Sequence, residues 1–279
     1  MSYQDAFEYV VKRSLERHQR AREGWAEYEK TRSLGWINNQ CDRGNGPFNT
    51  DESVLCYCMA YMHSHYEAAK IALSDVAQAL TKKSAVAVLD IGCGPMTAAL
   101  ALAQLNLNRF GQPLALSYIG VDISAPMLKF AERFSQRDDC FSSTSGGFYR
   151  FVPTLEEVTT DRLKRLINGA THVVIVLSYI MSQKNLSFAN VDDIAKIASR
   201  VRTLADGREV WLVYSNAYPF EGKFQYFLGR CEVLELEFEK TVTTKVSHPM
   251  RQHRLTPGKI VHVNSPRGHN LEFLATRAK

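Results

Sequence analysis

The stretch Val86-Ala87-Val88-Leu89-Asp90-Ile91-Gly92-Cys93-Gly94-Pro95 decides the fold of this chain. It begins as a short apolar run rich in β-branched residues, which is typical of a strand buried on both faces. It ends in an acid, two glycines and a proline, and the helix-prone run 98–105 follows. Glycines let a backbone turn tightly and approach a ligand closely, and the start of a helix offers exposed N–H donors. The stretch therefore predicts a strand, a turn and a helix that form a nucleotide-type ligand site.

A second strand that also ends in an acid follows over residues 115–124, and it closes with Gly120-Val121-Asp122-Ile123-Ser124. Together with Leu89 to Gly94, this segment resembles the first two motifs of the class I methyltransferases that depend on S-adenosylmethionine (AdoMet). The resemblance implies that the glycine turn packs against the methionine part of AdoMet and that Asp122 binds the ribose hydroxyls. A dinucleotide dehydrogenase also combines a glycine turn with a later acid, but the acid-x-Gly-x-Gly order favours the methyltransferase.

The resemblance implies further contacts with the cofactor at the ends of the first, second and fourth strands. The residues expected to bind AdoMet are Asp90, Gly92, Cys93, Gly94, Asp122, Ile123, Met127, Leu177 and Ser178. Residues 153–155, after the third strand at 148–152, are expected near the adenine. The family usually has a third glycine where this chain has Met96. A Cβ at that corner is expected to narrow the pocket or to shift the turn.

Composition limits the class of protein. The chain has 279 residues, of which 45% are hydrophobic and 23% charged, values that are ordinary for a soluble globular protein. Its longest apolar run, at 173–177, is far shorter than the about 18 residues that a membrane span needs. The N-terminus lacks the basic start and apolar core of a secretory signal. Six scattered cysteines lack the spacing of a zinc site. We therefore expect a cytoplasmic protein with reduced thiols, no metal and no membrane partner.

The positive charge is concentrated at the C-terminal end. Segment 240–279 holds eight basic residues and one acid, a net charge of +7, which leaves −2 for the rest of a chain whose total is +5. Such a segment attracts anionic partners, either RNA or a phosphorylated small molecule. The alternative is a solvated loop between two strands.

A helix with polar aromatic residues is predicted just before the first strand. Thr50 or Asp51 fits its N-cap, and the helical pattern continues to about residue 80. Tyr57, Tyr61 and His65 recur every four residues and share one edge of this helix. They are candidates to border the AdoMet pocket, where His65 or Tyr61 could act as a base or orient an acceptor. The alternative is a His65 that is simply hydrogen-bonded at a helix surface.

The fourth strand, at 171–179, ends at the methyl-transfer site if the resemblance holds. Amino-directed DNA and protein methyltransferases carry Asn or Asp, Pro-Pro and an aromatic residue there, and this chain has 177-Leu-Ser-Tyr-Ile-Met-181 instead. It also lacks the Pro-Cys of the cysteine-dependent route to 5-methylcytosine. Ser178 and Tyr179 remain to position an acceptor, and Tyr179 is the better catalytic candidate. The alternative for Tyr179 is packing at the rim of the pocket.

The last part of the chain predicts an antiparallel pair of strands. A fifth strand is expected over 209–216, and apolar residues then alternate with glutamates over 233–246, the period of a half-exposed strand. Residues 271–276 are its expected partner, and 247–270 between them reads as a long basic insert with four histidines. A further helix is expected to begin at Leu155, with Thr154 as its N-cap.

These elements predict an α/β fold, a doubly wound and mostly parallel sheet with a C-terminal antiparallel strand pair. We expect residues 1–50 to form a helical extension or lid that carries Trp25, Tyr28 and Trp36, and residues 51–279 to form the AdoMet-binding domain. The function expected is transfer of a methyl group from AdoMet to N or O, less readily to C, of a small molecule. The alternatives are an RNA methyltransferase that uses the basic C-terminal segment and a non-catalytic AdoMet-binding scaffold or partner subunit.

Overall fold

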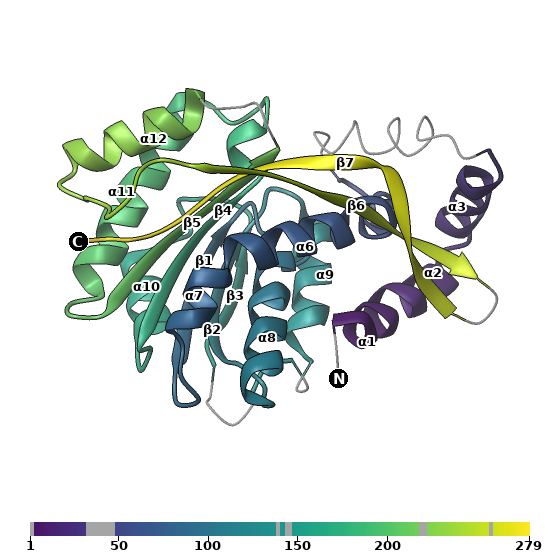
Figure 1. The fold of residues 1–279 in the computed structure, drawn as a ribbon, viewed down its shortest axis with the longest axis horizontal. Coiled ribbons are helices and arrows are strands. Elements are labelled where there is room, and N and C mark those ends of the chain that lie inside the picture. Colours follow the sequence, from purple (N-terminus) through teal and green to yellow (C-terminus); the bar gives the residue numbers. More distant parts are fainter. Residues whose placement is uncertain (1–2, 32–47, 138–139, 143–146, 218–221, 257–258) are drawn as a thin grey trace.

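The computed structural model describes residues 3–31, 48–137, 140–142, 147–217, 222–256 and 259–279. A seven-stranded sheet runs through these residues in the order β3-β2-β1-β4-β5-β7-β6 (Figure 1). Strands β1 to β5 pair in parallel, and β7 pairs antiparallel with both β5 and β6. The predicted fold class is therefore confirmed. The strands are β1 (Ala85–Ile91), β2 (Ala115–Val121), β3 (Tyr149–Val152), β4 (His172–Ser178), β5 (Glu209–Ala217), β6 (Thr244–Thr256) and β7 (Lys259–Arg277).

Helices cover both faces of the sheet. One face carries α6 (His63–Ala72), α7 (Ser74–Ala79), α8 (Thr97–Phe110) and α9 (Ala125–Ser135), and the other carries α10 (Thr160–Ile167), α11 (Phe188–Leu204) and α12 (Gly222–Val233). In the described part of the chain, no helix has the length and apolar content that crossing a membrane requires. The remaining helical segments are α1 (Tyr3–Phe7), η1 (Glu8–Lys12), α2 (Arg13–Arg17), α3 (Gln19–Thr31), α5 (Asp51–Tyr57), η3 (Cys58–Met62) and η5 (Ile180–Ser182).

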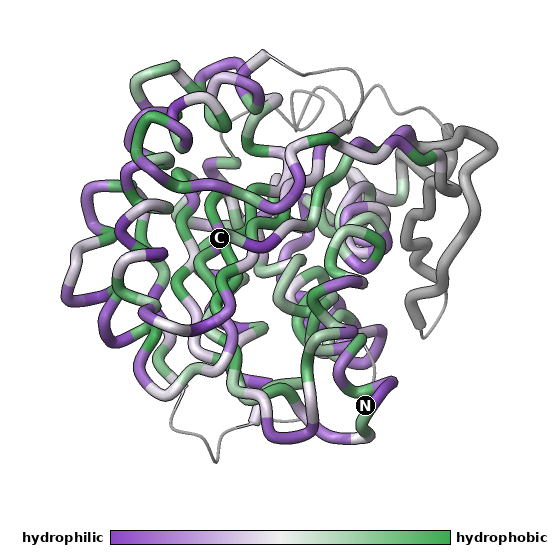
Figure 2. Tube along the Cα trace, turned by 60° about the vertical axis from the view of Figure 1, so that its left-hand side comes forward, coloured by the Kyte–Doolittle hydropathy of each residue, from purple (hydrophilic) through white to green (hydrophobic). Residues whose placement is uncertain are grey.

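The core lies on both sides of the central strands because successive residues of a strand point to opposite faces. Val88 and Val174 pack toward the layer of α6 to α9, whereas Leu89 and Ile175 pack toward α10 and α11. Figure 2 shows the hydrophobic residues running along these central strands. The apolar run that starts the deciding stretch is therefore a strand buried on both faces, as its composition predicts.

The N-terminal helices belong to the same core as the sheet. Phe7, Val11 and Leu15 are buried in the cluster that contains α8 and α9. The backbone N–H of Tyr3 donates to Oε1 of Gln104 on α8 (2.7 Å), and Arg133 of α9 donates to Oγ of Ser14 (3.0 Å). Residues 3–17 therefore pack on the helix layer beside the sheet. Trp36 lies outside the described residues, and the division at residue 50 stays a prediction.

Two predicted helix starts have different outcomes. Thr50 caps α5 as expected, because its side chain accepts the N–H of Ser53 (3.1 Å) and Ser53 reciprocates in a capping box. The helix expected to begin at Leu155 begins at Thr160 instead. Its N-cap is Thr159, whose side chain accepts the N–H of Arg162 (3.3 Å). Residues 153–155 therefore stay in an irregular segment that lines a cavity.

The expected strand over 233–246 is wrong in its position. Segment 234–243 lies between α12 and β6, and Leu236 and Phe238 bury their side chains against the α11 and α12 layer. Phe238 forms an isolated bridge with Ala278, so the alternating pattern serves core contacts without a ladder. The insert expected at 247–270 is also wrong, because most of it is strand. Its two halves pair with each other, and the registers include His248 with His269 and His253 with His262.

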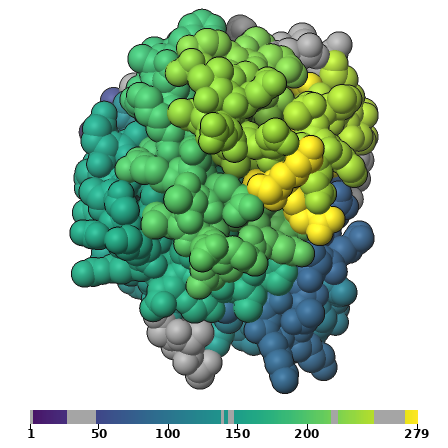
Figure 3. Space-filling view, turned by 90° about the vertical axis from the view of Figure 1, so that its left-hand side faces the viewer, coloured from purple at the N-terminus to yellow at the C-terminus, as the bar shows by residue number. Residues whose placement is uncertain are grey.

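The long β6–β7 hairpin connects two distant parts of the molecule. Its sheet end joins β5 along residues 271–277, and its other end extends across the molecule toward α2 and α3 (Figure 1). On the way, β6 packs against η3 and α6, which are the helices before β1. The last residues of β7 (yellow) lie at the surface between the segment that carries α12 (light green) and the segment that carries α7 (blue) in Figure 3.

Candidate functional site

A cavity of about 600 Å³ lies at the carboxyl ends of β1, β2 and β4. The chain order reverses between β1 and β4, and ligands of open α/β sheets bind at such a switch point. The volume lies within the about 300–1,000 Å³ that small-molecule sites occupy. The cavity is lined by the turn after β1, the residues that follow β2, β3 and β4, one face of α5 to α6, and the start of α11. Its position and its volume are therefore those of a small-molecule binding site in an open α/β sheet.

The glycine turn after β1 needs its glycines. Gly92 and Gly94 have φ of +79° and +50°, a region in which a side chain is strained. A Cβ on Gly92 would also lie 3.0 Å from the Cβ of Ile180, so Ile180 would have to shift to admit one. The N–H groups of Gly92 and Cys93 both donate to the carbonyl of Val121 (2.8 and 3.0 Å), which ties the turn to β2.

Met96 does not narrow the cavity, contrary to the expectation from the sequence. Its backbone has φ of +67°, the conformation for which a glycine is usual, so the turn keeps its shape in spite of the Cβ. Its side chain is fully buried in the core and does not line the cavity. The cost of the methionine is therefore backbone strain, and the ligand space is unaffected.

Asp122 is held at the cavity by two backbone donors. Its Oδ2 accepts the N–H of Gly94 (2.9 Å), and its Oδ1 accepts the N–H of Ser124 (2.8 Å). Burial raises the pKa of the Asp122 carboxyl, and these two hydrogen bonds oppose that rise by stabilising the anion. The acid after β2 is thus fixed beside the glycine turn, and each of its oxygens keeps one lone pair for a ligand.

Asp90 forms part of the floor of the cavity and is 1% exposed. Its Oδ2 accepts the hydroxyl of Tyr118 (2.9 Å), while its Oδ1 has no hydrogen-bond partner. The pKa of Asp90 is raised to about 7, because burial raises it more than the hydrogen bond from Tyr118 lowers it, and the nearby charge of Asp122 contributes to the rise. A buried oxygen without a partner is costly, so this position calls for a donor from a ligand or a proton.

Five rings face the glycine turn across the cavity, and we call them the aromatic wall. They are Phe48, Tyr57, Tyr61, His65 and Tyr179. The wall is continuous, because successive ring centroids are 5.2 Å apart for Phe48 and Tyr57, 5.6 Å for Tyr57 and His65, and 4.0 Å for His65 and Tyr179. Tyr61 lies 6.1 Å from Tyr57 and 6.3 Å from His65. A hydrogen bond of 2.7 Å joins the hydroxyl of Tyr57 to Nδ1 of His65.

Tyr179 reaches this wall through an unusual backbone. It follows β4 directly with φ of +59°, and its N–H donates to the carbonyl of Ser215 (2.7 Å). A bulky residue in this region is strained by about 1–3 kcal/mol, and such strain is concentrated at functional sites. Burial raises the pKa of the Tyr179 hydroxyl, so the phenol stays neutral. The three predicted catalytic residues, Tyr61, His65 and Tyr179, are therefore brought together in one wall.

The structure places all but one of the predicted cofactor residues at the cavity. Those that line it are Asp90, Gly92, Cys93, Gly94, Asp122, Ile123, Met127 and Ser178. Leu177 does not. It is the neighbour of Ser178 on β4 and therefore points to the opposite face, where it is buried in the cluster of α10 and α11.

Sequence reasoning missed some of the residues that line the cavity. Phe48 precedes the cap of α5 in a segment that carries no motif, so nothing in the sequence singled it out. Gln183 and Asn190 follow β4, and their place after a parallel strand was a usable signal. The side chain of Asn190 also accepts the N–H of Ser187 (3.1 Å) at the start of α11.

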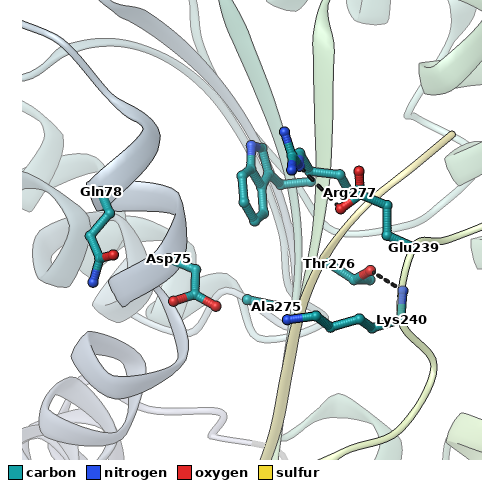
Figure 4. A pocket seen from close by; sticks show the side chains of 8 residues that line it. Asp75, Gln78, Glu239, Lys240, Ala275, Thr276 and Arg277 are labelled. Atoms are coloured by element: carbon teal, nitrogen blue, oxygen red, sulfur yellow. Dashed lines mark hydrogen bonds and ion pairs between the residues drawn. The ribbon is translucent and has the colours of Figure 1, made fainter.

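A second hollow of about 220 Å³ lies between α7 and the end of β7 (Figure 4). It shares no described lining residue with the cavity at the carboxyl ends of the strands. Two of its polar contacts hold the C-terminal strand: Nε of Arg277 lies 3.2 Å from Glu239, and the N–H of Lys240 donates to Oγ1 of Thr276 (2.9 Å). We assign it no ligand.

The strand directions are those that the resemblance to the class I methyltransferases implies, namely parallel strands with a C-terminal antiparallel strand pair. The cavity lies where that fold binds its ligand, at the switch point between β1 and β4. The chain has the class I methyltransferase fold. Gly92 after β1, Asp122 after β2 and Tyr179 after β4 all line this cavity.

Comparisons with known proteins find solved structures that are similar to the chain, but no relative by sequence. No family model and no curated protein matches the chain. It is similar to magnesium protoporphyrin IX methyltransferase from Synechocystis PCC 6803 with bound S-adenosylmethionine, at 15% identity, a TM-score of 0.38 and coverage of 88% of this chain and 92% of that chain. A SAM-dependent methyltransferase of Methanosarcina mazei gives 16% identity, a TM-score of 0.41 and coverage of 74% and 96%.

A third solved structure is precorrin-6y C5,15-methyltransferase from Geobacter metallireducens GS-15, with 12% identity, a TM-score of 0.41 and coverage of 74% of this chain and 88% of that chain. Identities and TM-scores this low carry no argument about activity. The fold assignment therefore rests on the sheet of the chain itself.

Proposed function

We propose that the cavity binds AdoMet and that the protein transfers its methyl group to a small molecule held against the aromatic wall. The observation that supports this proposal best is the convergence of three elements on one cavity. They are the glycine turn after β1, Asp122 after β2, and the polar end of β4 at Ser178. Each arises from a different strand, and their joint position matches the cofactor contacts that the sequence resemblance implies.

The parts of AdoMet have plausible partners in this arrangement. Asp122, with a free lone pair on each oxygen, would accept the two ribose hydroxyls. Ile123 is 73% exposed although apolar, so a flat adenine ring over it would remove hydrophobic surface from water. The methionine part would lie along the glycine turn, with its ammonium group as a donor for the unpartnered Oδ1 of Asp90.

The reaction would be a direct displacement at the methyl carbon. Such a reaction needs the acceptor, the methyl group and the sulfur in line and needs water excluded, and a strong base is optional. Tyr61, His65 and Tyr179 are proposed to orient the acceptor, with His65 fixed by its hydrogen bond to Tyr57 (2.7 Å) and by stacking on Tyr179.

An RNA acceptor stays the second candidate because of the net charge of +7 over residues 240–279. The β6–β7 hairpin in this segment packs against η3 and α6, the helices that carry Tyr61 and His65. An RNA acceptor predicts salt-sensitive RNA binding. A non-catalytic AdoMet-binding scaffold is the third candidate, and AdoMet consumption with any acceptor would exclude it. We also propose a cytoplasmic location, and the division into 1–50 and 51–279.

Calorimetry with AdoMet tests the proposal. The parent should bind AdoMet, and Asp122→Ala should weaken binding at least a hundredfold, because two hydrogen bonds to a charged group together contribute about 3 kcal/mol or more. Asp75→Ala, in the small hollow away from the cavity, is the matched control and should bind like the parent. Unchanged binding by a folded Asp122→Ala variant would show that the cofactor site is wrong.

A further inference from the structure

The aromatic wall lies on the acceptor side of the cavity. The hydroxyl of Tyr57 is 4.0 Å from the position that a Cβ on Gly94 would occupy, so the wall reaches the glycine turn at van der Waals distance. If the methionine part of AdoMet lies along that turn, its sulfonium lies beside the rings. An acceptor that approaches the methyl carbon from the far side of the sulfur must then lie against the rings.

The lining of the cavity favours a cation on the acceptor. Asp90 and Asp122 line the cavity together with the rings, and in the proposed binding mode they accept the ammonium group and the ribose hydroxyls of AdoMet. Aromatic rings attract cations through their negative faces, and groups of such rings recognise quaternary ammonium ions. Because the cofactor engages the two carboxyl groups, the rings are the part of the lining that can stabilise a positive charge on the acceptor.

Methyl transfer moves the positive charge of the sulfonium to the acceptor, and therefore toward the aromatic wall. We propose that the acceptor is an amine, whose nitrogen becomes an ammonium ion against the wall; this inference rests on the proposed methyl transfer. The nitrogen lone pair forms a bond to the methyl carbon, the C–S bond breaks, and its electron pair stays on the sulfur of the neutral thioether. A primary or secondary amine that arrives as an ammonium ion first releases one proton to solvent. The neutral amine then keeps its remaining protons and becomes a cationic product, so the displacement itself needs no base. Rings that attract the cation more strongly as it forms stabilise the transition state over the ground state.

An oxygen acceptor fits this surrounding less well. A phenolate or carboxylate brings a negative charge against the negative faces of the rings, which would weaken its binding. Its product is neutral, so the aromatic wall would gain nothing as the reaction proceeds.

Two probes of equal shape test the inference. Choline carries a quaternary ammonium group, and 3,3-dimethylbutan-1-ol is its uncharged carbon isostere. Each is titrated into the full-length protein saturated with S-adenosylhomocysteine, the neutral thioether product, so that no sulfonium occupies the site. Choline should bind at least tenfold more tightly than the alcohol. Equal affinity for the two probes, or no choline binding at millimolar concentrations, would overturn the inference.

Variants locate the preference in the wall. Tyr61→Leu should lose most of the discrimination between the two probes, whereas Tyr61→Phe keeps the ring and should retain it. Tyr226→Leu, an exposed tyrosine on α12 outside the cavity, should discriminate like the parent. Full discrimination by a folded Tyr61→Leu variant would contradict a role for this ring. A protein that binds AdoMet but does not prefer choline would overturn only the amine inference, whereas failure to bind AdoMet would overturn the proposed function itself.

Discussion

At the scale of single residues, two acids define the cofactor side of the site, and one methionine stands in the turn next to it. Asp122 has both oxygens fixed by backbone N–H groups, and Asp90 has one oxygen fixed and one without a partner. Met96 keeps a glycine-like turn at the cost of strain. The sequence predicted the two acids through their place at strand ends. It did not predict where the side chain of Met96 points, because that depends on packing between distant helices.

Asp90 should make stability depend on pH. Its pKa is raised by burial to about 7 in the folded protein, above the value of 3.8 for an unperturbed carboxyl. The folded state therefore binds more protons than the unfolded state between about pH 4 and pH 7, so the contribution of Asp90 to the free energy of unfolding falls across that range. The free energy of unfolding of the parent and of Asp90→Asn is measured in urea at a series of pH values. The difference between them should change in favour of the variant as the pH rises to about 7 and should stay constant above pH 7. A difference that is constant with pH would contradict the raised pKa.

Met96→Gly tests which of two opposing effects is larger. A glycine relieves about 1–2 kcal/mol of strain at φ of +67°, but loss of a buried methionine side chain costs about 2–5 kcal/mol. We expect a net destabilisation of about 1–3 kcal/mol, measured by chemical denaturation. AdoMet affinity should stay close to that of the parent, because the side chain lies outside the cavity. A stabilised variant would show that strain outweighs packing here.

At the scale of elements, the buried strands could be predicted and the hairpin could not. Strands β1 and β4 are buried on both faces, so continuous apolar runs mark them in the sequence. Segment 234–243 alternates like a strand because Leu236 and Phe238 dock on the core, yet it forms no ladder. Over residues 247–256 and 259–270, the two strands of the hairpin pair with each other beyond the sheet, so the apolar periodicity that predicts strands is missing.

The aromatic wall also depends on packing between elements. Helical spacing placed Tyr57, Tyr61 and His65 together, since residues four apart share one side of a helix. Their meeting with Tyr179 requires α6 to lie over the end of β4, which no local pattern specifies. The sequence therefore predicted four members of the wall, but neither Phe48 nor the wall itself.

Ser124 connects the start of α9 to the wall. Its hydroxyl accepts the N–H of Met127 (3.2 Å) as the N-cap and donates to the carbonyl of Phe48 (2.5 Å). Ser124→Ala should cost about 1–2 kcal/mol of stability, because α9 loses its N-cap. It should also weaken binding of an acceptor, because the backbone of Phe48 loses the hydrogen bond that holds it. Thr159→Ala removes the cap of α10 away from the cavity and should reduce stability without affecting binding. Denaturation and calorimetry of both variants separate the two effects, and equal binding by both would contradict the link to the wall.

At the scale of the whole molecule, the N-terminal helices are part of the folded core. Tyr3, Phe7, Val11 and Leu15 are buried against the layer of α6, α8 and α9, and the ring of Tyr3 stacks on Tyr66 at 3.7 Å. Among the described residues before Asp51, Phe48 is the one that lines the cavity. The sequence predicted a helical extension over residues 1–50, but the docking site of its helices depended on tertiary contacts.

Removal of residues 2–17 should therefore destabilise the entire protein. It exposes the apolar surface of α8 and α9, and each large side chain lost from the core removes about 1.5–3 kcal/mol of burial. We expect a lower melting temperature and aggregation of the shortened protein, measured by differential scanning calorimetry and light scattering. A shortened protein with the melting temperature of the parent would show that these helices are a separate appendage.

The central claim is that one cavity holds AdoMet between the glycine turn and the aromatic wall. A crystal structure of the full-length protein grown with S-adenosylhomocysteine tests it most directly. The account predicts ribose hydroxyls hydrogen-bonded to Asp122, adenine over Ile123, and the sulfur facing Tyr179 and His65. A ligand bound elsewhere, or in this cavity without contact to Asp122, would contradict it.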